Sequence, residues 1–156
     1  MNHFDFRKDH KIAVQAEEEV ANLLRNANKD KIKNIEFNND NKYDLKITTN
    51  DNKVITVEVK QDFTCAKTGN VGVEFECRGR ASGISVSQAD LYFFKVHQPS
   101  GDIGYYMIET KTLKSMIKNN EYHRIVIGGD VGSNSKNYLF KLDIFRRKAK
   151  LFHKAG

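Results

Sequence analysis

The chain has 156 residues, of which 39% are hydrophobic and 29% are charged, a balance that suits one water-exposed domain with an apolar core. Two cysteines, Cys65 and Cys77, lack the CxxC spacing of a thiolate zinc site, and no apolar run approaches the about 18 residues of a membrane span. The net charge of +6 is compatible with a polyanionic partner. Because residues 1–11 also lack the apolar stretch of a signal peptide, we expect a cytoplasmic protein without a membrane partner.

Residues 12–24 have the spacing of an amphipathic helix, with apolar residues at 13, 16, 20, 21, 23 and 24 and asparagines at 26 and 28 to end it. Glu17 lies on the apolar side of this helix and is predicted to point toward a sheet, whereas Glu18 and Glu19 face more toward water. A carboxylate on a core-facing side is costly unless it is paired or bound to a metal. Glu17 is therefore a candidate metal ligand, and an ordinary surface acid is the alternative interpretation.

Two alternating segments, YDLKITT at 43–49 and KVITVEVK at 53–60, flank the turn residues at 50–52 and predict a β-hairpin. Pairing residue 49 with residue 53 places Asp44 opposite Glu58, and a slip of one residue would move them to opposite faces. The strand period of two puts Lys60 on the same face as Glu58. Glu58 and Lys60 alone would also fit a solvated charge pair, but Asp44 and Glu17 together favour a metal site.

The sequence of residues 64–109 predicts three further strands and one short helix. We expect a loop at 64–70, a strand at Val71–Cys77, a turn rich in Gly, Ser and Arg, and a short helix at 85–90 capped by Ser85 or Ser87. Glu74 and Glu76 share one side of the predicted strand, either as further ligands or, as we prefer, as its solvated face. The apolar run LYFFKV at 91–96 is typical of a buried strand, and residues 101–109 predict another.

The last third of the chain predicts a helix at 110–120 capped by Thr110 or Thr112, a strand within 121–130, and a strand or helix with a basic end within 137–152. The glycine-rich residues 128–137 lack the Walker and Rossmann spacings and favour a flexible turn. With no repeat or linker, the order of elements predicts one α/β domain with a mixed sheet.

Asp44, followed by a hairpin and Glu58-Val59-Lys60, resembles the motif of the PD-(D/E)xK nuclease superfamily, which includes restriction endonucleases and archaeal Holliday junction resolvases. The residue before Asp44 is Tyr43, where the motif has proline. The resemblance implies an α/β fold with a restriction-endonuclease-like mixed β-sheet flanked by helices. Residues 1–156 would form this single domain, with a basic end at about 145–156.

The same resemblance implies a site that binds Mg²⁺, with Mn²⁺ as a substitute, through Asp44 and Glu58, while Lys60 assists the attacking water and the phosphate. Residues 16–24 resemble the helix that supplies a further acidic residue in resolvase-like members. Glu17 fits that role best by position, and Glu18 is the alternative.

Residues 74–90 resemble a segment of phage-encoded members of the superfamily. Arg78 and Arg80 could clamp a phosphate there, and Ser82, Gly83 and the amides of the predicted helix from 85 could donate to it. The implied activity is a Mg²⁺-dependent DNA endonuclease in the cytoplasm, that of the host if the chain is phage-encoded. Branched or junction DNA would be a plausible substrate, and a homodimer would cut both strands symmetrically.

Two alternatives stay open. One is a module that retains the fold and binds nucleic acid or protein without cutting, although the presence of Asp44, Glu58 and Lys60 together argues against it. The other is an RNA nuclease, which would use the same chemistry.

Overall fold

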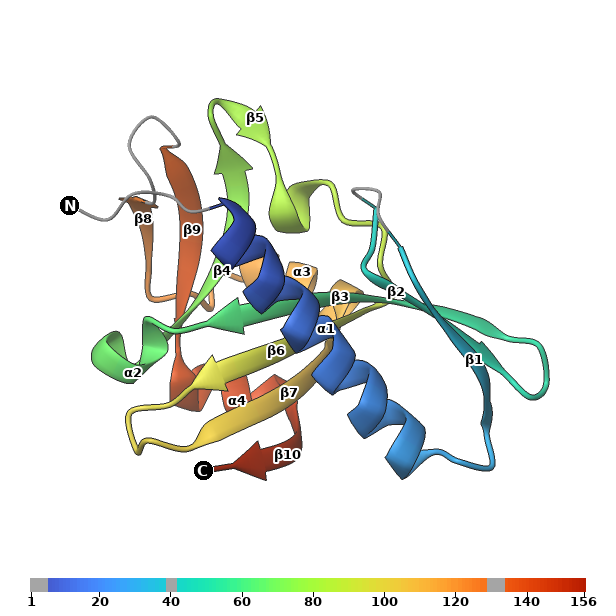
Figure 1. Cartoon of the computed structure of the whole chain (residues 1–156). Coiled ribbons are helices and arrows are strands. Elements are labelled where there is room, and N and C mark those ends of the chain that lie inside the picture. Colours follow the sequence, from blue (N-terminus) through green and yellow to red (C-terminus); the bar gives the residue numbers. More distant parts are fainter. Residues whose placement is uncertain (1–5, 39–41, 129–133) are drawn as a thin grey trace.

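Two β-sheets with helices around them form the part of the chain that the computed structural model describes, residues 6–38, 42–128 and 134–156 (Figure 1). The six strands of the larger sheet are, in spatial order, β1 (Ile32–Phe37), β2 (Leu45–Thr49), β3 (Val54–Asp62), β6 (Leu91–His97), β7 (Ile103–Glu109) and β10 (Lys150–Ala155). The four strands of the smaller sheet are β5 (Arg80–Ala81), β4 (Asn70–Cys77), β9 (Ser135–Lys141) and β8 (Arg124–Gly128). Only β3 and β6 pair in parallel among these strands, so the larger sheet is mixed, which confirms the predicted α/β class.

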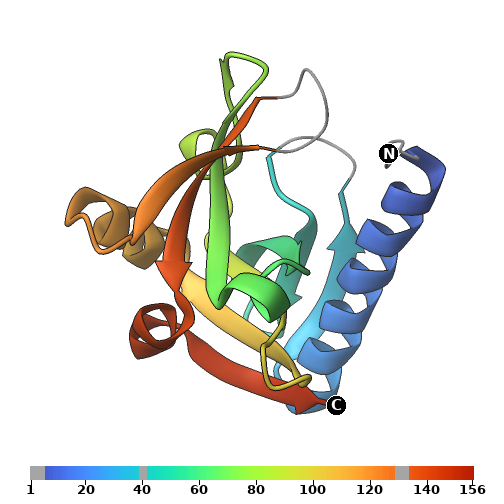
Figure 2. The ribbon, with the colours of Figure 1, turned by 90° about the vertical axis from the view of Figure 1, so that its left-hand side faces the viewer.

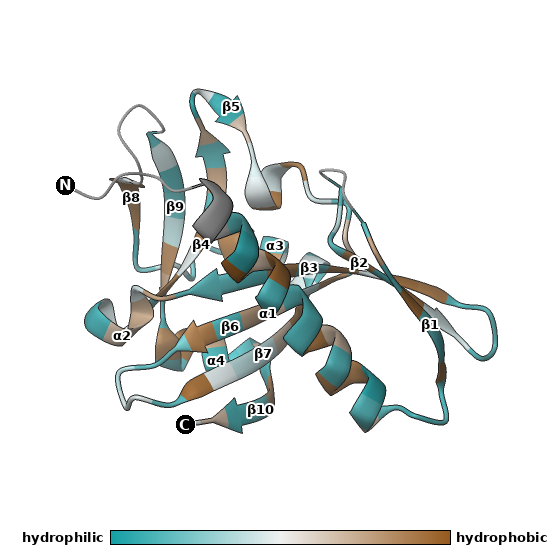
Figure 3. Ribbon diagram, viewed as in Figure 1, coloured by the Kyte–Doolittle hydropathy of each residue, from teal (hydrophilic) through white to brown (hydrophobic). Residues whose placement is uncertain are grey.

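The long helix α1 (Phe6–Ala27) covers one face of the larger sheet (Figure 1). Its buried residues Val20, Ala21 and Leu24 belong to one apolar cluster with residues of β2, β3, β6 and β7, which include Leu45 and Phe93. Teal and brown residues alternate along the helix in Figure 3, as expected for one polar and one apolar side. The helix ends where Asn28 Nδ2 donates to the Leu24 carbonyl at 3.1 Å, as the sequence predicted.

The second core lies on the other side of β6, which therefore has no face in water. Tyr92 and Phe94 of β6 share this core with Val71 and Phe140 of the smaller sheet. Helices α3 (Thr110–Lys118) and α4 (Leu142–Lys148) add buried side chains to the same core, among them Phe145. Burial on both faces explains the continuous apolar run at 91–96.

The hairpin of β2 and β3 has the predicted register. Thr48 pairs with Val54 and Leu45 with Val57, and the Thr49 amide donates to the Lys53 carbonyl at 2.9 Å. The three-residue loop closes with Asn52 at φ +64°, a left-handed conformation that asparagine tolerates better than most residues.

The predicted helix at 85–90 is wrong. A short 3₁₀ turn at Gly83–Ser85 precedes an extended segment whose polar groups are used by neighbours. The Gln88 amide donates to the Lys42 carbonyl at 3.2 Å, and the Asp90 amide to the Thr56 carbonyl at 3.0 Å. The Asp90 carboxylate accepts from the Thr56 amide at 2.9 Å. These bonds tie the segment to the edge of β3 and compete with a helix.

Three smaller expectations also differ. Residues 65–68 of the predicted loop form helix α2 (Cys65–Thr68), because Asp62 Oδ1 accepts from the Cys65 amide at 2.9 Å. Neither Thr110 nor Thr112 caps α3, where Glu109 is the N-cap residue without a side-chain bond. Strand β1 has no counterpart in the sequence prediction, since a register shift between Ile32 and Asn34 breaks its alternation.

The predicted basic end, about 145–156, is part of the fold. It comprises the second half of α4 and strand β10, which pairs with β7, and Lys154 forms an ion pair with Asp102 at 3.3 Å. Residues 129–133 of the predicted glycine-rich turn lie outside the described residues, although Gly128 and Ser135 on either side are paired. None of the helices in the described ranges is long and apolar enough to cross a membrane.

Candidate active site

Asp44 is fixed against β3 by one bond of its main chain and one of its side chain. It lies one residue before β2, where its amide donates to the Val57 carbonyl at 2.9 Å. Its Oδ2 atom accepts from the Val59 amide at 2.7 Å. The register of the two strands ends at Leu45 and Val57, so the predicted pair of Asp44 and Glu58 is not part of it. The two carboxylates are nevertheless close enough for the charge of Asp44 to raise the pKa of Glu58, and both line one pocket.

Glu58 and Lys60 lie side by side on β3 with Nζ 3.5 Å from Oε1. The side chain of Glu58 is 14% exposed and that of Lys60 is 41% exposed, so the acid is enclosed while the ammonium reaches solvent. Burial and the charge of Asp44 raise the pKa of Glu58 to about 7, although Lys60 opposes the shift. A solvated charge pair on an open strand would not produce this enclosure.

Glu17 of α1 reaches the same place from the other side of the hairpin. Burial and the charge of Asp44 raise its pKa to about 7, with further contributions from a hydrogen bond to Asp44 and from the charge of Glu58. Glu18 is exposed. Of the two helix carboxylates considered from the sequence, Glu17 is therefore the one that joins Asp44 and Glu58.

Glu19 does not face water, which corrects the prediction. It forms an ion pair with Lys95 of β6 at 2.8 Å and accepts a hydrogen bond from the Tyr105 hydroxyl at 2.5 Å. These bonds outweigh the effect of burial and lower the pKa of Glu19. The position of Lys95 within the apolar run LYFFKV could have predicted an acidic partner, because a buried ammonium group requires an acid.

A pocket of about 320 Å³ opens beside Asp44 and Glu58. It is lined by Asp44, Glu58 and Lys60 from the hairpin and by Ala81, Ser82, Gly83, Val86 and Ser87 from the connection between β5 and β6. Gly83 has φ +51°, and a Cβ atom there would lie 2.1 Å from the Glu74 carbonyl oxygen. Only glycine lets this connection pass so close to β4.

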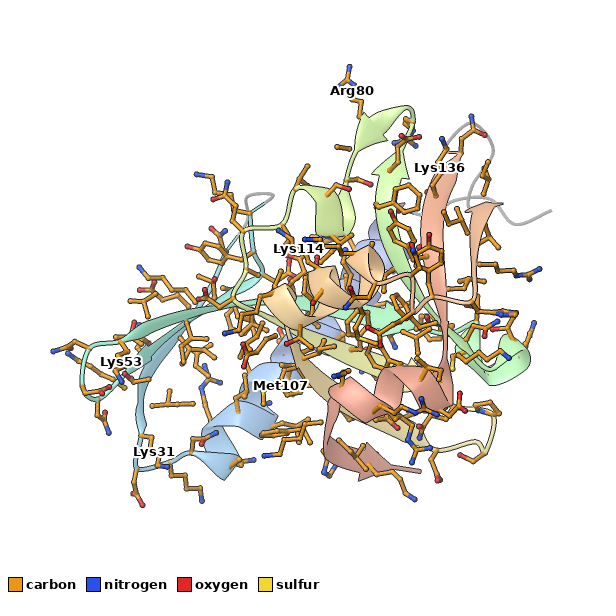
Figure 4. All side chains as sticks on the ribbon, turned by 180° about the vertical axis from the view of Figure 1, so that it is seen from behind. Lys31, Lys53, Arg80, Met107, Lys114 and Lys136 are labelled. Atoms are coloured by element: carbon orange, nitrogen blue, oxygen red, sulfur yellow. The ribbon has the colours of Figure 1, made fainter. Side chains whose placement is uncertain are left out.

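Of the four residues predicted to contact phosphate, Ser82 and Gly83 line the pocket, and the Ser82 hydroxyl donates to Glu74 Oε2 at 3.0 Å. Arg78 and Arg80 are exposed at the tip of the hairpin of β4 and β5 and are not among its lining residues. Figure 4 shows Arg80 pointing outward at the end of this hairpin. The expected amide donors of a helix from residue 85 are missing, since no helix forms there.

The glutamates of β4 do not form one solvated face. A register shift separates Glu74 from Glu76, and both are half-buried. Glu74 accepts the hydrogen bond from Ser82, whereas Glu76 forms an ion pair with Lys136 at 2.9 Å.

Tyr92 of β6 lies next to Glu58 on the neighbouring strand, and the sequence analysis did not identify it. It pairs with Glu58 in the parallel register and is 1% exposed. Burial raises its pKa to about 12, and the charges of Glu58, Asp44 and Glu74 add to the shift, while Ser87 lowers it. No hydrogen bond of normal geometry satisfies the buried hydroxyl among the described residues. An unsatisfied phenol beneath three acids marks a place for a bound oxygen, such as a water molecule.

The donor chemistry of Glu17, Asp44 and Glu58 fits a hard divalent cation, which prefers carboxylate oxygens. The raised pKa values of both glutamates reflect burial first and the charge of Asp44 second. Within the described part of the chain, no three His, Cys, Asp or Glu side chains already converge as a metal cage. The carboxylates of Glu17, Asp44 and Glu58 would have to move closer together to coordinate an ion.

Family models, curated proteins and solved structures yield no match to this chain.

Proposed function

We propose that this chain is a metal-dependent nuclease of the restriction-endonuclease-like type that hydrolyses DNA phosphodiester bonds. The observation that carries the proposal is the position of Asp44 and Glu58 beside the ammonium group of Lys60 at one pocket, with Glu17 of α1 near enough for the charges of Asp44 and Glu58 to raise its pKa. The pKa of both glutamates is raised to about 7, and shifts of this kind are frequent at catalytic sites.

Asp44, Glu58 and Glu17 would hold Mg²⁺, or Mn²⁺ in its place. When bound, such a cation stabilises charge on the phosphate oxygens and lowers the pKa of water. Glu17 and Glu58 must release their protons before they can serve as ligands, because only the ionised carboxylate binds a cation well. Asp44 contributes the oxygen that is free of the Val59 amide.

Lys60 would orient the attacking water and donate to a phosphate oxygen, since its ammonium group lies beside Glu58 yet reaches solvent. Water attacks the phosphorus in line, a new P–O bond forms and the P–O3′ bond breaks. The water loses one proton and the leaving 3′ oxygen gains one, so charge and atoms balance. A homodimer in the cytoplasm would allow both strands of a duplex to be cut symmetrically.

The test is incubation of the purified chain with labelled linear, flapped and four-way-junction DNA in Mg²⁺, Mn²⁺ or EDTA. We expect cleavage only with a metal. Asp44→Asn and Lys60→Ala should each lower the rate by roughly 10²-fold or more, because each removes a charge that acts in the transition state.

Lys53→Ala is the matched control, since Lys53 lies on the same hairpin with its side chain 78% exposed. Circular dichroism melting checks that each variant folds. Equal cutting by wild type, Asp44→Asn and Lys60→Ala would overturn the site, and tight binding without cutting in either metal would support a non-catalytic module. Labelled RNA in the same assay separates a ribonuclease from a deoxyribonuclease.

A further inference from the structure

A second pocket adjoins the acidic one. It has a volume of about 500 Å³ and lies between the end of β3 and the smaller sheet. Lys60 and Gly83 line both pockets, so the second pocket is the immediate neighbour of the acidic one. Figure 2 shows β4 and β9 rising on one side of β3 and α1 rising on the other.

The lining of this second pocket does not suit a phosphate. Among the described residues that line it, Lys60 is the one Lys or Arg, and the carboxylates of Asp62 and Glu74 also line it. Asp62 is occupied, because it accepts from the Cys65 and Gly72 amides at 2.9 and 2.8 Å. A phosphate placed here would meet two negative charges.

The same lining suits the edge and faces of a nucleobase. The Asn137 amide supplies both donors and acceptors. The hydroxyl groups of Thr64 and Ser135 also line the pocket, and they donate to Asp62 and Cys77 and can still accept. The apolar part of the wall comes from Val73, Ile84, Phe94 and Leu139. Apolar walls with a few polar groups are typical of sites for flat heterocyclic ligands.

Phe63 supplies an aromatic surface at this pocket. Its side chain is 52% exposed although the ring is held by stacking on His97, with centroids 4.4 Å apart and an interplanar angle of 23°. His97 is in turn fixed by Gln61, whose Nε2 lies 2.9 Å from His97 Nε2. A fixed and exposed aromatic ring is the kind of surface on which an unpaired base stacks.

We propose that this pocket binds one unpaired nucleobase of the substrate, next to the phosphate at Lys60. The inference rests on the proposed function and narrows it to DNA with an unpaired nucleotide, such as a flap or a splayed end. A base within a perfect duplex would first have to be unstacked and unpaired, which weakens duplex binding.

The experiment measures binding of a flapped DNA and of a fully paired duplex, with Ca²⁺ in place of Mg²⁺ to prevent cutting. Phe63→Ala should weaken binding of the flapped DNA about 10-fold, equivalent to about 1.4 kcal/mol, and leave duplex binding within about 2-fold. Phe37→Ala is the matched control, because Phe37 is 48% exposed on β1 and does not line the pocket. Asn137→Ala should weaken flap binding as well.

A 2-aminopurine placed in the flap beside the junction gives an independent readout, since its fluorescence changes when its stacking changes. We expect a change on binding to wild type that Phe63→Ala reduces. Unaltered flap affinity in both Phe63→Ala and Asn137→Ala, or no fluorescence change with wild type, would overturn the base pocket. Because cleavage and its loss in Asp44→Asn are measured separately, the nuclease proposal can survive that result or fail without it.

Discussion

The protons held by Glu17 and Glu58 link the stability of the protein to pH. Each glutamate has a folded-state pKa of about 7 against an ordinary value of 4.5. The folded state therefore retains protons that the unfolded chain releases, and their stabilising effect is complete below pH 4.5 and is lost as the pH rises through about 7.

We accordingly expect the thermal midpoint of wild type to be lower at pH 8 than at pH 6 by at least about 2 °C, the shift that 1 kcal/mol produces in a chain of this size. Differential scanning calorimetry at both values measures it. Glu17→Gln should flatten the dependence, whereas the exposed neighbour variant Glu18→Gln should leave it unchanged. A midpoint that rises from pH 6 to pH 8 in wild type would contradict the protonated site.

At the scale of elements, the orientation of α1 depends on the bonds that Glu19 makes to β6 and β7. Lys95 is 9% exposed, so Glu19→Gln would leave a buried ammonium group without its partner, at a cost of about 3–5 kcal/mol. We expect the thermal midpoint to fall by roughly 6–20 °C. Cleavage should fall too, because Glu17 precedes Glu19 by half a turn of the same helix.

The double variant Glu19→Leu/Lys95→Met is the control, as it removes both charges and keeps apolar volume. It should regain most of the lost midpoint, since apolar replacements of buried ion pairs are often neutral or stabilising. Equal thermal midpoints of Glu19→Gln and Glu18→Gln would show that the ion pair of Glu19 and Lys95 does not fix the orientation of α1.

The elements that the sequence predicted are those whose pattern is local and regular. The hairpin register followed from two alternating segments around a turn, and it brought Asp44 and Glu58 to the same pocket. The core-facing side of α1 followed from its period and placed Glu17. The helix predicted at 85–90 was wrong because amide and carboxylate groups of this segment form hydrogen bonds with Thr56 and Lys42, which are distant in sequence. The prediction that Glu19 faces water was wrong because Glu19 forms an ion pair with Lys95, which lies on a strand 76 positions later.

At the scale of the whole molecule, the smaller sheet ends in an edge strand with exposed apolar residues. Ile125 and Ile127 of β8 are 48% and 65% exposed, and β8 pairs only with β9 among the described strands. Such an edge favours association between copies.

Ile127→Lys should therefore raise the concentration at which the protein begins to aggregate, as measured by light scattering, and should leave DNA cleavage unchanged. Lys154→Ala is a control for a general effect of charge, because it removes a charge at another surface. Unchanged aggregation in Ile127→Lys would show that β8 is not the contact.

The pairing of β4 with β9 also sets an order of events during synthesis. Asn70 pairs with Lys141, so β4 cannot join its partner until more than 60 further residues have left the ribosome. The hairpin that holds Asp44 and Glu58 needs only its own local turn and can form far earlier. A nascent chain would therefore have its acids in position before the walls that receive a substrate exist. Folding of the smaller sheet would be the last step before the site could act.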